Sequence, residues 1–220
     1  MAESRDLALL LRQIPFRESS LVLQLLTQSH GRIALMAKGI RRANHRLRPH
    51  LAPLSPLTLR WVGGSRGMGT LTDLARGKAL LPPSHHLAGM ELLALSGKLF
   101  RSGDPHGFPE TIAAIARLAQ SPDSILGSCR AGWLLLQQAG TVSSLDHCWS
   151  CGVELPTTHH AHWQQQQCRC DQCCHPAAGA SMPLSSDLRA LVNGEARLPT
   201  PEQILHWQQI IQQGAQPSCI

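Results

Sequence analysis

The sequence contains no tyrosine and only three phenylalanines among its 220 residues, and aromatic residues make up 4% of the chain. It also lacks any apolar run that approaches the roughly 20 residues needed to span a bilayer. No phosphate-binding glycine loop, G-x-S-x-G nucleophile motif or H-E-x-x-H metal motif is present. We therefore expect no membrane span and no enzyme active site, because the scattered acids do not pair with histidines in a catalytic pattern.

No targeting segment is recognisable. Glu3 and Asp6 precede the first short apolar run, whereas a secretory signal begins with basic residues. Cys219 stands second from the end, so the C-terminus is not a prenylation motif. We expect a cytoplasmic protein. In that compartment, eight cysteines favour a metal site or free thiols over a disulfide framework.

Acidic residues are scarce in the first part of the chain. Residues 1–80 contain thirteen Lys and Arg against four Asp and Glu, while residues 81–220 contain seven against ten. A basic front and a mildly acidic back predict two modules with different partners. The front suits a polyanion such as nucleic acid, although a basic surface can also serve solubility alone.

The hydrophobic period changes near residue 80. Before it, five short apolar runs at 7–14, 20–27, 32–38, 55–61 and 68–75 are separated by turn-like segments such as 63–67, which predicts strands of a small barrel. After it, helical spacing appears at 85–102, 108–121, 121–140, 185–194 and 200–213. We predict an α+β protein: a five-stranded OB-type β-barrel at 1–80, then an α-helical domain at 81–220 with an inserted zinc-finger hairpin at about 146–176.

Two C-x-x-C pairs define this hairpin, namely Cys148 with Cys151 and Cys170 with Cys173. Zinc prefers four tetrahedral ligands, and two such pairs joined by a hairpin of this length can supply them. Gly152 permits the tight turn after the first pair. A complete set of four thiolates leaves no coordination position for a catalytic water. We therefore predict one structural Zn²⁺ rather than a catalytic centre.

Other residues in the segment compete for these roles. Cys168 or Cys174 could replace one of the four sulfurs, as could one of four histidines, His159, His160, His162 and His175. A redox C-x-x-C is disfavoured because neither pair stands where a strand meets a helix in a thioredoxin-like pattern. Cys129 lies on the apolar face of a predicted helix, so we expect it in the core.

The segment KGIRRANHRLR at residues 38–48 carries five basic residues and no acid. It follows a predicted strand, so a loop on the rim of the barrel would track a phosphate backbone by charge. Only Phe16 and Trp61 are aromatic in the first 80 residues. We expect electrostatic, sequence-independent binding rather than base reading. The candidate DNA-binding residues are Arg17, Arg32, Lys38, Arg41, Arg42, Arg46 and Arg48.

The order of these features resembles the RecO family of bacterial recombination mediators. The resemblance rests on Glu18-Ser19, Thr27, Gly31 and the run Ala37-Lys38-Gly39-Ile40-Arg41-Arg42, followed by LRPHLAPLSPLTLRW at 47–61, then Gly140 and the two C-x-x-C pairs. It covers most of residues 5–195. The glutamines at 165–167 stand where the family often has Gly-Gly, and the helix around Met90 lacks a tyrosine often seen nearby.

The resemblance implies an N-terminal OB barrel and a helical domain that often carries a zinc finger. It implies binding to single- and double-stranded DNA, strand annealing, and contact with the acidic tail of the single-strand-binding protein. With RecR, such proteins help RecA load on DNA, and they act at the bacterial nucleoid. Lys98, Arg101, Arg117 and Arg130 are the basic residues available for the acidic tail. Two alternatives remain: a zinc-dependent nucleic-acid-processing enzyme, and a basic adaptor that docks an acidic protein.

Overall fold

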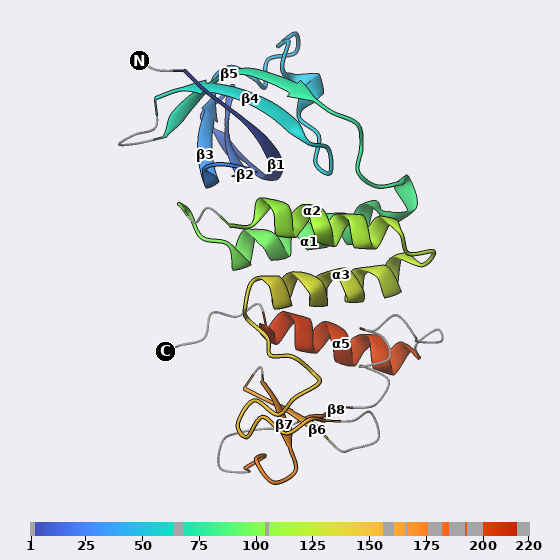
Figure 1. Ribbon diagram of the computed structural model, residues 1–220. Coiled ribbons are helices and arrows are strands. Elements are labelled where there is room, and N and C mark those ends of the chain that lie inside the picture. The colour runs from blue at the N-terminus through green and yellow to red at the C-terminus, as the bar shows by residue number, and fades with distance from the viewer. Residues whose placement is uncertain are drawn as a thin grey trace. The chain divides into compact units, whose positions relative to one another are not determined.

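The computed structural model describes residues 3–63, 68–103, 106–155, 161–165, 167–175, 182–184, 192 and 200–214. The chain divides into two compact units, Met1–Gln120 and Ser121–Ile220 (Figure 1). Strands give way to helices between residues 76 and 83. This change lies near residue 80, whereas the two compact units divide after Gln120. The domain boundary after residue 80 stays a prediction.

The first unit begins with a closed five-stranded barrel in the order β1-β2-β3-β5-β4. The strands are β1 (Glu3–Phe16), β2 (Ser20–Thr27), β3 (Gly31–Ala37), β4 (Leu57–Val62) and β5 (Gly69–Arg76). This confirms the predicted OB-type fold, in which one parallel pairing, β3 with β5, closes the sheet. The long β1 pairs with β4 along its first half and with β2 along its second half, and its pairing with β2 shifts register between Leu10 and Arg12.

Leucine fills the barrel although β-branched residues are better strand formers. Residues at alternate positions, such as Leu21, Leu23 and Leu25 in β2, point into the core and are almost fully buried. Trp61 of β4 and Leu71 of β5 complete the interior. Burial on one face of each strand thus outweighs the weak intrinsic preference of leucine for helices.

Gly69 lies where the barrel closes. The pairing of β3 with β5 comprises only Leu35 with Gly69 and Met36 with Thr70. A Cβ atom at Gly69 would lie 2.9 Å from Cδ1 of Trp61 and 3.0 Å from Cδ2 of Leu35, both of which are buried. Glycine therefore permits β5 to approach β3 closely at this point.

Helices complete the first unit. The short 3-10 helix η1 (Arg48–His50) lies in the β3–β4 connection, and η2 (Pro83–His85) leads into α1 (His86–Leu99), which packs against α2 (Phe108–Ala119) and contacts β1. Pro109 and Glu110 begin α2 as predicted, and the Gly107 N–H donates to Oε2 of Glu110 at 2.8 Å. Arg32 of β3 donates to the backbone carbonyls of Gly97 and Phe100 at the end of α1.

The second unit combines helices α3 (Ser124–Gln138) and α5 (Pro201–Gly214) with a small sheet in the order β7-β6-β8. The strands are β6 (Ala161–Gln164), β7 (Gln167–Cys170) and β8 (Met182–Leu184). Trp133 of α3 and Trp163 of β6 have ring centroids 5.5 Å apart and share a core with Trp207 of α5. The sheet therefore packs on helices and does not depend on its own small core alone.

The helix ends of the second unit follow the sequence signals. Oδ1 of Asp123 accepts from the N–H groups of Ile125 and Leu126, and α3 is followed by Gly140 in the left-handed region. Thr200 and Gln203 form reciprocal side-chain bonds at the start of α5. Of the helix predicted at 185–194, only Val192 belongs to the described residues. Of the turn predicted at 63–67, only Gly63 does. No described helix is long and apolar enough to cross a bilayer.

Candidate metal centre and nucleic-acid surface

The two C-x-x-C pairs converge on one point in the second unit. The sulfur atoms of Cys148, Cys151, Cys170 and Cys173 all lie within 4.8 Å of one another, and those of Cys151 and Cys170 are 3.8 Å apart. Four sulfurs at such distances are suited to a single tetrahedral ion of the thiophilic kind. The geometry could therefore hold one metal ion.

The first pair lies on a tight backbone turn. The Cys148 N–H donates to the Val153 carbonyl at 2.8 Å, and the Gly152 N–H donates back to the Cys148 carbonyl at 2.9 Å. Gly152 has a φ of 72°, which residues with a side chain rarely adopt, so it lets the chain reverse directly after Cys151. Cys148 is buried in the core of the unit while Cys151 is exposed.

The second pair lies at the end of the β6–β7 hairpin. Cys170 ends β7, and the N–H groups of Cys173 and Cys174 both donate to its carbonyl at 3.0 Å. The Trp149 N–H donates to the Cys168 carbonyl of β7 at 2.8 Å, which ties the first turn to the second. Backbone hydrogen bonds therefore bring the two pairs together.

The pKa values of Cys148 and Cys173 are shifted in opposite directions. Burial opposes ionisation of Cys148, but hydrogen bonds from the backbone of Cys170, Cys151 and Ser150 outweigh it and lower the pKa of Cys148 to about 6. Hydrogen bonding with the side chains of Cys170 and Cys151, together with burial and the charge of Cys148, raises the pKa of Cys173 to about 12. A cation among the sulfurs would stabilise all four thiolates.

In the part of the chain that the structure describes, the competing sulfur and imidazole groups do not belong to this cluster. Cys168 is fully buried in the core, its N–H donates to Oγ of Ser143 at 2.8 Å, and its thiol faces the Leu145 carbonyl at 3.9 Å. Nε2 of His162 lies 2.7 Å from Oδ1 of Asp171. Among the described residues, only the four cysteines named above form a cluster with ligand geometry. His159, His160 and Cys219 lie outside those residues, and Cys129 is buried on α3 as predicted.

In the first unit, the basic segment 38–48 follows β3 and is anchored to the turn between β1 and β2. The Arg41 N–H donates to the Ser19 carbonyl at 2.9 Å, and the Gly39 N–H donates to Oγ of Ser20 at 3.2 Å. The Arg41 guanidinium reaches the Arg17 carbonyl at 3.4 Å. These contacts bring Arg17 close to Arg41 and to the adjacent Arg42, and we name these three exposed cations the basic cluster.

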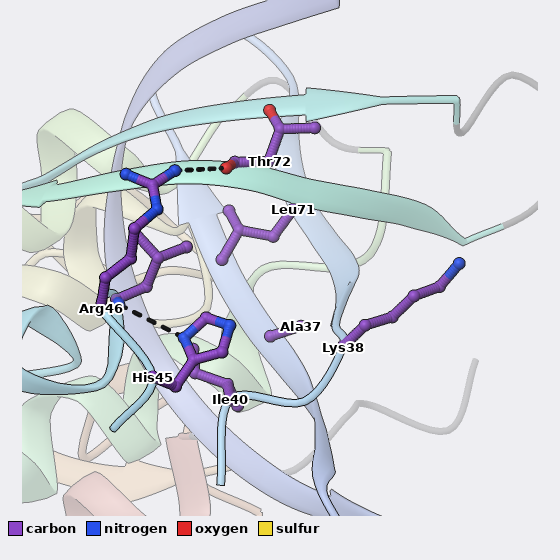
Figure 2. Close-up of a pocket in the computed structure, with 8 residues that line it drawn as sticks. Ala37, Lys38, Ile40, His45, Arg46, Leu71 and Thr72 are labelled. Carbon is purple, nitrogen blue, oxygen red and sulfur yellow. Dashed lines mark hydrogen bonds between the residues drawn. The ribbon is translucent and has the colours of Figure 1, made fainter. Parts of the chain in front are cut away.

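Lys38 and Arg46 border a shallow cavity beside this cluster (Figure 2). The Arg46 guanidinium donates to the Thr72 carbonyl at 3.3 Å and lies 3.2 Å from Oδ1 of Asp73. Its side chain is 72% exposed, and that of Asp73 is 46% exposed. Arg46, one of the seven predicted DNA-binding residues, thus forms an ion pair with Asp73. The sequence does not predict this pair, because the two residues are far apart along the chain.

Arg32 and Arg48 differ from the others in their surroundings. Arg32 lies at the opposite end of β3 from Lys38, about 20 Å away along the strand, and its guanidinium is held by carbonyls of α1 and the following residue. Arg48 begins η1 and is exposed. The structure therefore brings Arg17, Arg41 and Arg42 together and places Arg32 apart from them.

The two aromatic residues of the barrel differ in exposure. Trp61 is buried, and its ring meets that of His30 edge-on at a centroid distance of 5.2 Å. Phe16 is 38% exposed, and the Arg17 guanidinium lies 5.3 Å from the centre of its ring. Whether DNA binding depends on charge rather than on aromatic stacking therefore stays a prediction.

Comparisons with known proteins identify relatives of this chain. Residues 1–76 match the family model described as recombination protein O N terminal. The chain is 34% identical over 151 residues to the DNA repair protein RecO of Cupriavidus pinatubonensis, covering 64% of this chain and 50% of that protein. It is 35% identical over 149 residues to DNA repair protein RecO of Polynucleobacter asymbioticus, covering 64% and 61%. For the protein of that name from Burkholderia pseudomallei, the identity is 37% over 148 residues, covering 63% and 51%. The matches thus span about half to three fifths of the length of these relatives.

The sulfur cluster predicts that Cys170→Ser abolishes metal binding, whereas Cys174→Ser preserves it, because only Cys170 is among the four clustered sulfurs. Metal analysis of purified wild type should give about one ion per chain. The apparent affinity of the protein for the metal ion should fall as pH falls. The reason is that the ion must displace the proton of Cys173, whose pKa is raised. Competition with a chromogenic chelator measures this affinity. Equal metal content in the two variants would contradict the ligand assignment.

Proposed function

The chain belongs to the RecO family of DNA repair proteins, and we propose that it is a DNA-binding recombination mediator rather than an enzyme. The observation that carries this proposal is the basic cluster at one end of the barrel, where Arg17, Arg41 and Arg42 are exposed together. A phosphate backbone that passes this end of the barrel would be attracted by all three cations. The proposed ligands are single- and double-stranded DNA.

The contact should be mainly with phosphates. Guanidinium groups bind phosphate oxygens by paired, charge-assisted hydrogen bonds, and such contacts position a strand without reading its sequence. Lys38 and Arg48 extend the basic cluster as exposed cations of the same connection. Arg46 would join them once DNA phosphates compete with Asp73 for its guanidinium. Arg32 stays in the proposal as a peripheral contact at most, since α1 already holds it.

For the metal centre we propose one structural Zn²⁺ held by Cys148, Cys151, Cys170 and Cys173. Zinc fits because a set of four thiolates is typical of its structural sites. Such a shell offers no open position for water, which supports a mediator over a zinc-dependent enzyme. The ion would fix the β6–β7 hairpin against the core that contains Trp133 and Trp163.

The finer activities follow from family membership. We propose that the protein anneals complementary strands and, with RecR, helps RecA load on DNA covered by the single-strand-binding protein. Its place of action would be the bacterial cytoplasm, at the nucleoid. For the acidic tail of the single-strand-binding protein we propose the basic residues of the helices. Lys98 lies in the last turn of α1, Arg101 follows it, Arg117 lies in the last turn of α2, and Arg130 lies in α3.

The double substitution Arg41→Ala with Arg42→Ala should weaken binding to single-stranded DNA about tenfold at moderate salt, because two phosphate contacts are lost. The slope of log affinity against log salt concentration should shrink by about 1.4. Fluorescence anisotropy with a labelled oligonucleotide at several salt concentrations measures both quantities.

The matched control is Lys78→Ala with Arg117→Ala, which removes the same charge from exposed positions outside the basic cluster. This control should bind nearly as wild type. If the Arg41 and Arg42 variant bound as tightly as wild type at every salt concentration, or if the control weakened binding equally, the assignment to the basic cluster would be wrong.

The converse substitution is Asp73→Asn. It removes the carboxylate beside Arg46, so the guanidinium can turn to DNA without breaking an ion pair. Binding should tighten about two- to fivefold, and the salt slope should steepen by about 0.7. Glu91→Gln on the exposed face of α1 is the control, because it makes the same change in net charge elsewhere. An equal gain from both variants would show an effect of net charge and would exclude a specific role for Asp73.

A further inference from the structure

The turn that begins at Cys148 presents a large aromatic ring to solvent. All five tryptophans of the sequence belong to the described residues, and four of them are at most 5% exposed. The fifth, Trp149, is 61% exposed, and Val153 at the other end of the same turn is 50% exposed. Tryptophan is among the residue types most enriched where binding energy concentrates in protein interfaces. An exposed tryptophan and an exposed valine on one turn therefore mark a candidate docking surface.

Backbone hydrogen bonds hold this turn in place. The Cys148 N–H donates to the Val153 carbonyl at 2.8 Å, which brings the two ends of the turn together. The Trp149 N–H donates to the Cys168 carbonyl of β7 at 2.8 Å, so the residue that carries the exposed ring is itself tied to the small sheet. A surface whose backbone is ordered before binding loses less conformational entropy when a partner docks on it.

The chain around the turn carries more negative than positive charge. Residues 142–175 contain three acidic residues and one arginine. Asp146 and Glu154 are exposed on the two arms that lead into and out of the turn, and the Leu155 N–H joins these arms by donating to the Asp146 carbonyl at 2.7 Å. Four thiolates around a doubly charged ion would add a further net negative charge at the same place. The surface therefore attracts cations and repels a phosphate backbone.

We propose that the turn at 148–153 is the docking surface for a basic segment of a partner protein. A lysine or arginine side chain of that segment lies over the Trp149 ring, whose face attracts cations, and an apolar side chain of the same segment packs on Val153. The carboxylates of Asp146 and Glu154 attract the segment and favour it over an acidic or a nucleic-acid partner. This inference adds a protein contact to the second unit and does not depend on the proposed DNA binding.

The electrostatic premise is tested by quenching the fluorescence of the full-length protein with caesium and with iodide at equal ionic strength. Collisional quenching reports mainly on Trp149, because the other four tryptophans are buried. Relative to free tryptophan amide, caesium should quench more effectively than iodide, since a negative surface concentrates cations. Quenching that favours iodide, or that shows the same ratio as the free compound, would contradict the proposal.

Docking itself is tested with a short synthetic peptide in which arginine alternates with leucine. Its addition should protect Trp149 from quenching by acrylamide, and the protection should weaken as salt concentration rises. The matched peptide with glutamate in place of each arginine should give no protection. Failure of the arginine peptide to protect, or equal protection by the two peptides, would overturn the proposal.

Variants locate the contact, with binding followed by the anisotropy of a labelled arginine peptide. Trp149→Ala should weaken binding about five- to tenfold and retain the metal, because Trp149 supplies no ligand atom. Its control is Leu205→Ala, which removes an apolar side chain of α5 that is 60% exposed and lies outside the turn. Unchanged binding by Trp149→Ala, or an equal loss in the control, would contradict the assignment.

The role of charge is tested by Glu154→Gln, which should weaken binding of the arginine peptide about two- to threefold. Glu202→Gln, at an exposed position in the first turn of α5, makes the same change in net charge and should leave binding nearly unchanged. Equal losses in these two variants would show an effect of net charge alone and would overturn the specific surface. Metal content and circular dichroism confirm that each variant is folded.

Discussion

The close approach of β5 to β3 at Gly69 is the constraint on which the barrel depends. Only two residue pairs join these strands, and a Cβ atom at Gly69 would crowd the buried side chains of Trp61 and Leu35. The pairing closes the barrel, yet it is too short to seal the whole gap between the strands. The β3–β4 connection covers the part of β3 and β5 that is not paired, and its residue Arg46 lines the cavity left there.

The basic cluster depends on the same local arrangement. Hydrogen bonds from Gly39 and Arg41 to the β1–β2 turn hold the connection against the barrel rim, so that Arg17 meets Arg41 although 24 residues separate them. If DNA binds here as we propose, holding this connection in place beforehand would reduce the entropy lost on binding. Asp73 opposes the effect at one position, because its carboxylate partly neutralises Arg46. The same surface therefore carries cations that attract a polyanion and a carboxylate that weakens this attraction at Arg46.

The cysteine cluster serves the second unit by a different principle. Its sheet is small, and a hairpin of that size buries too little apolar surface to be stable alone. The cluster lies beside a core that includes Cys148, Cys168 and the tryptophans of α3, β6 and α5. Sulfur ligation and indole packing would therefore stabilise the same hairpin.

Local signals made much of this predictable from the sequence. Alternating leucines marked the strands, Thr200 and Gly140 marked helix ends, and the spacing of two C-x-x-C pairs marked the sulfur cluster. Three features depended on contacts between distant residues and had no local signal. They are the meeting of Arg17 with Arg41, the ion pair of Arg46 with Asp73, and the cavity between β3 and β5. Cys168 was ambiguous for the same reason, since only packing shows that it faces the core.

We propose that the loop arginines of the barrel bind DNA, while the metal centre stabilises the fold of the second unit. The most direct measurement is the rate at which complementary strands coated with single-strand-binding protein anneal, with salt varied, for wild type and for the variant with Arg41→Ala and Arg42→Ala. We predict that the wild type accelerates annealing most at low salt, and that the variant loses most of this acceleration while retaining its metal content. Annealing at the wild-type rate by a folded, metal-containing variant would contradict the account.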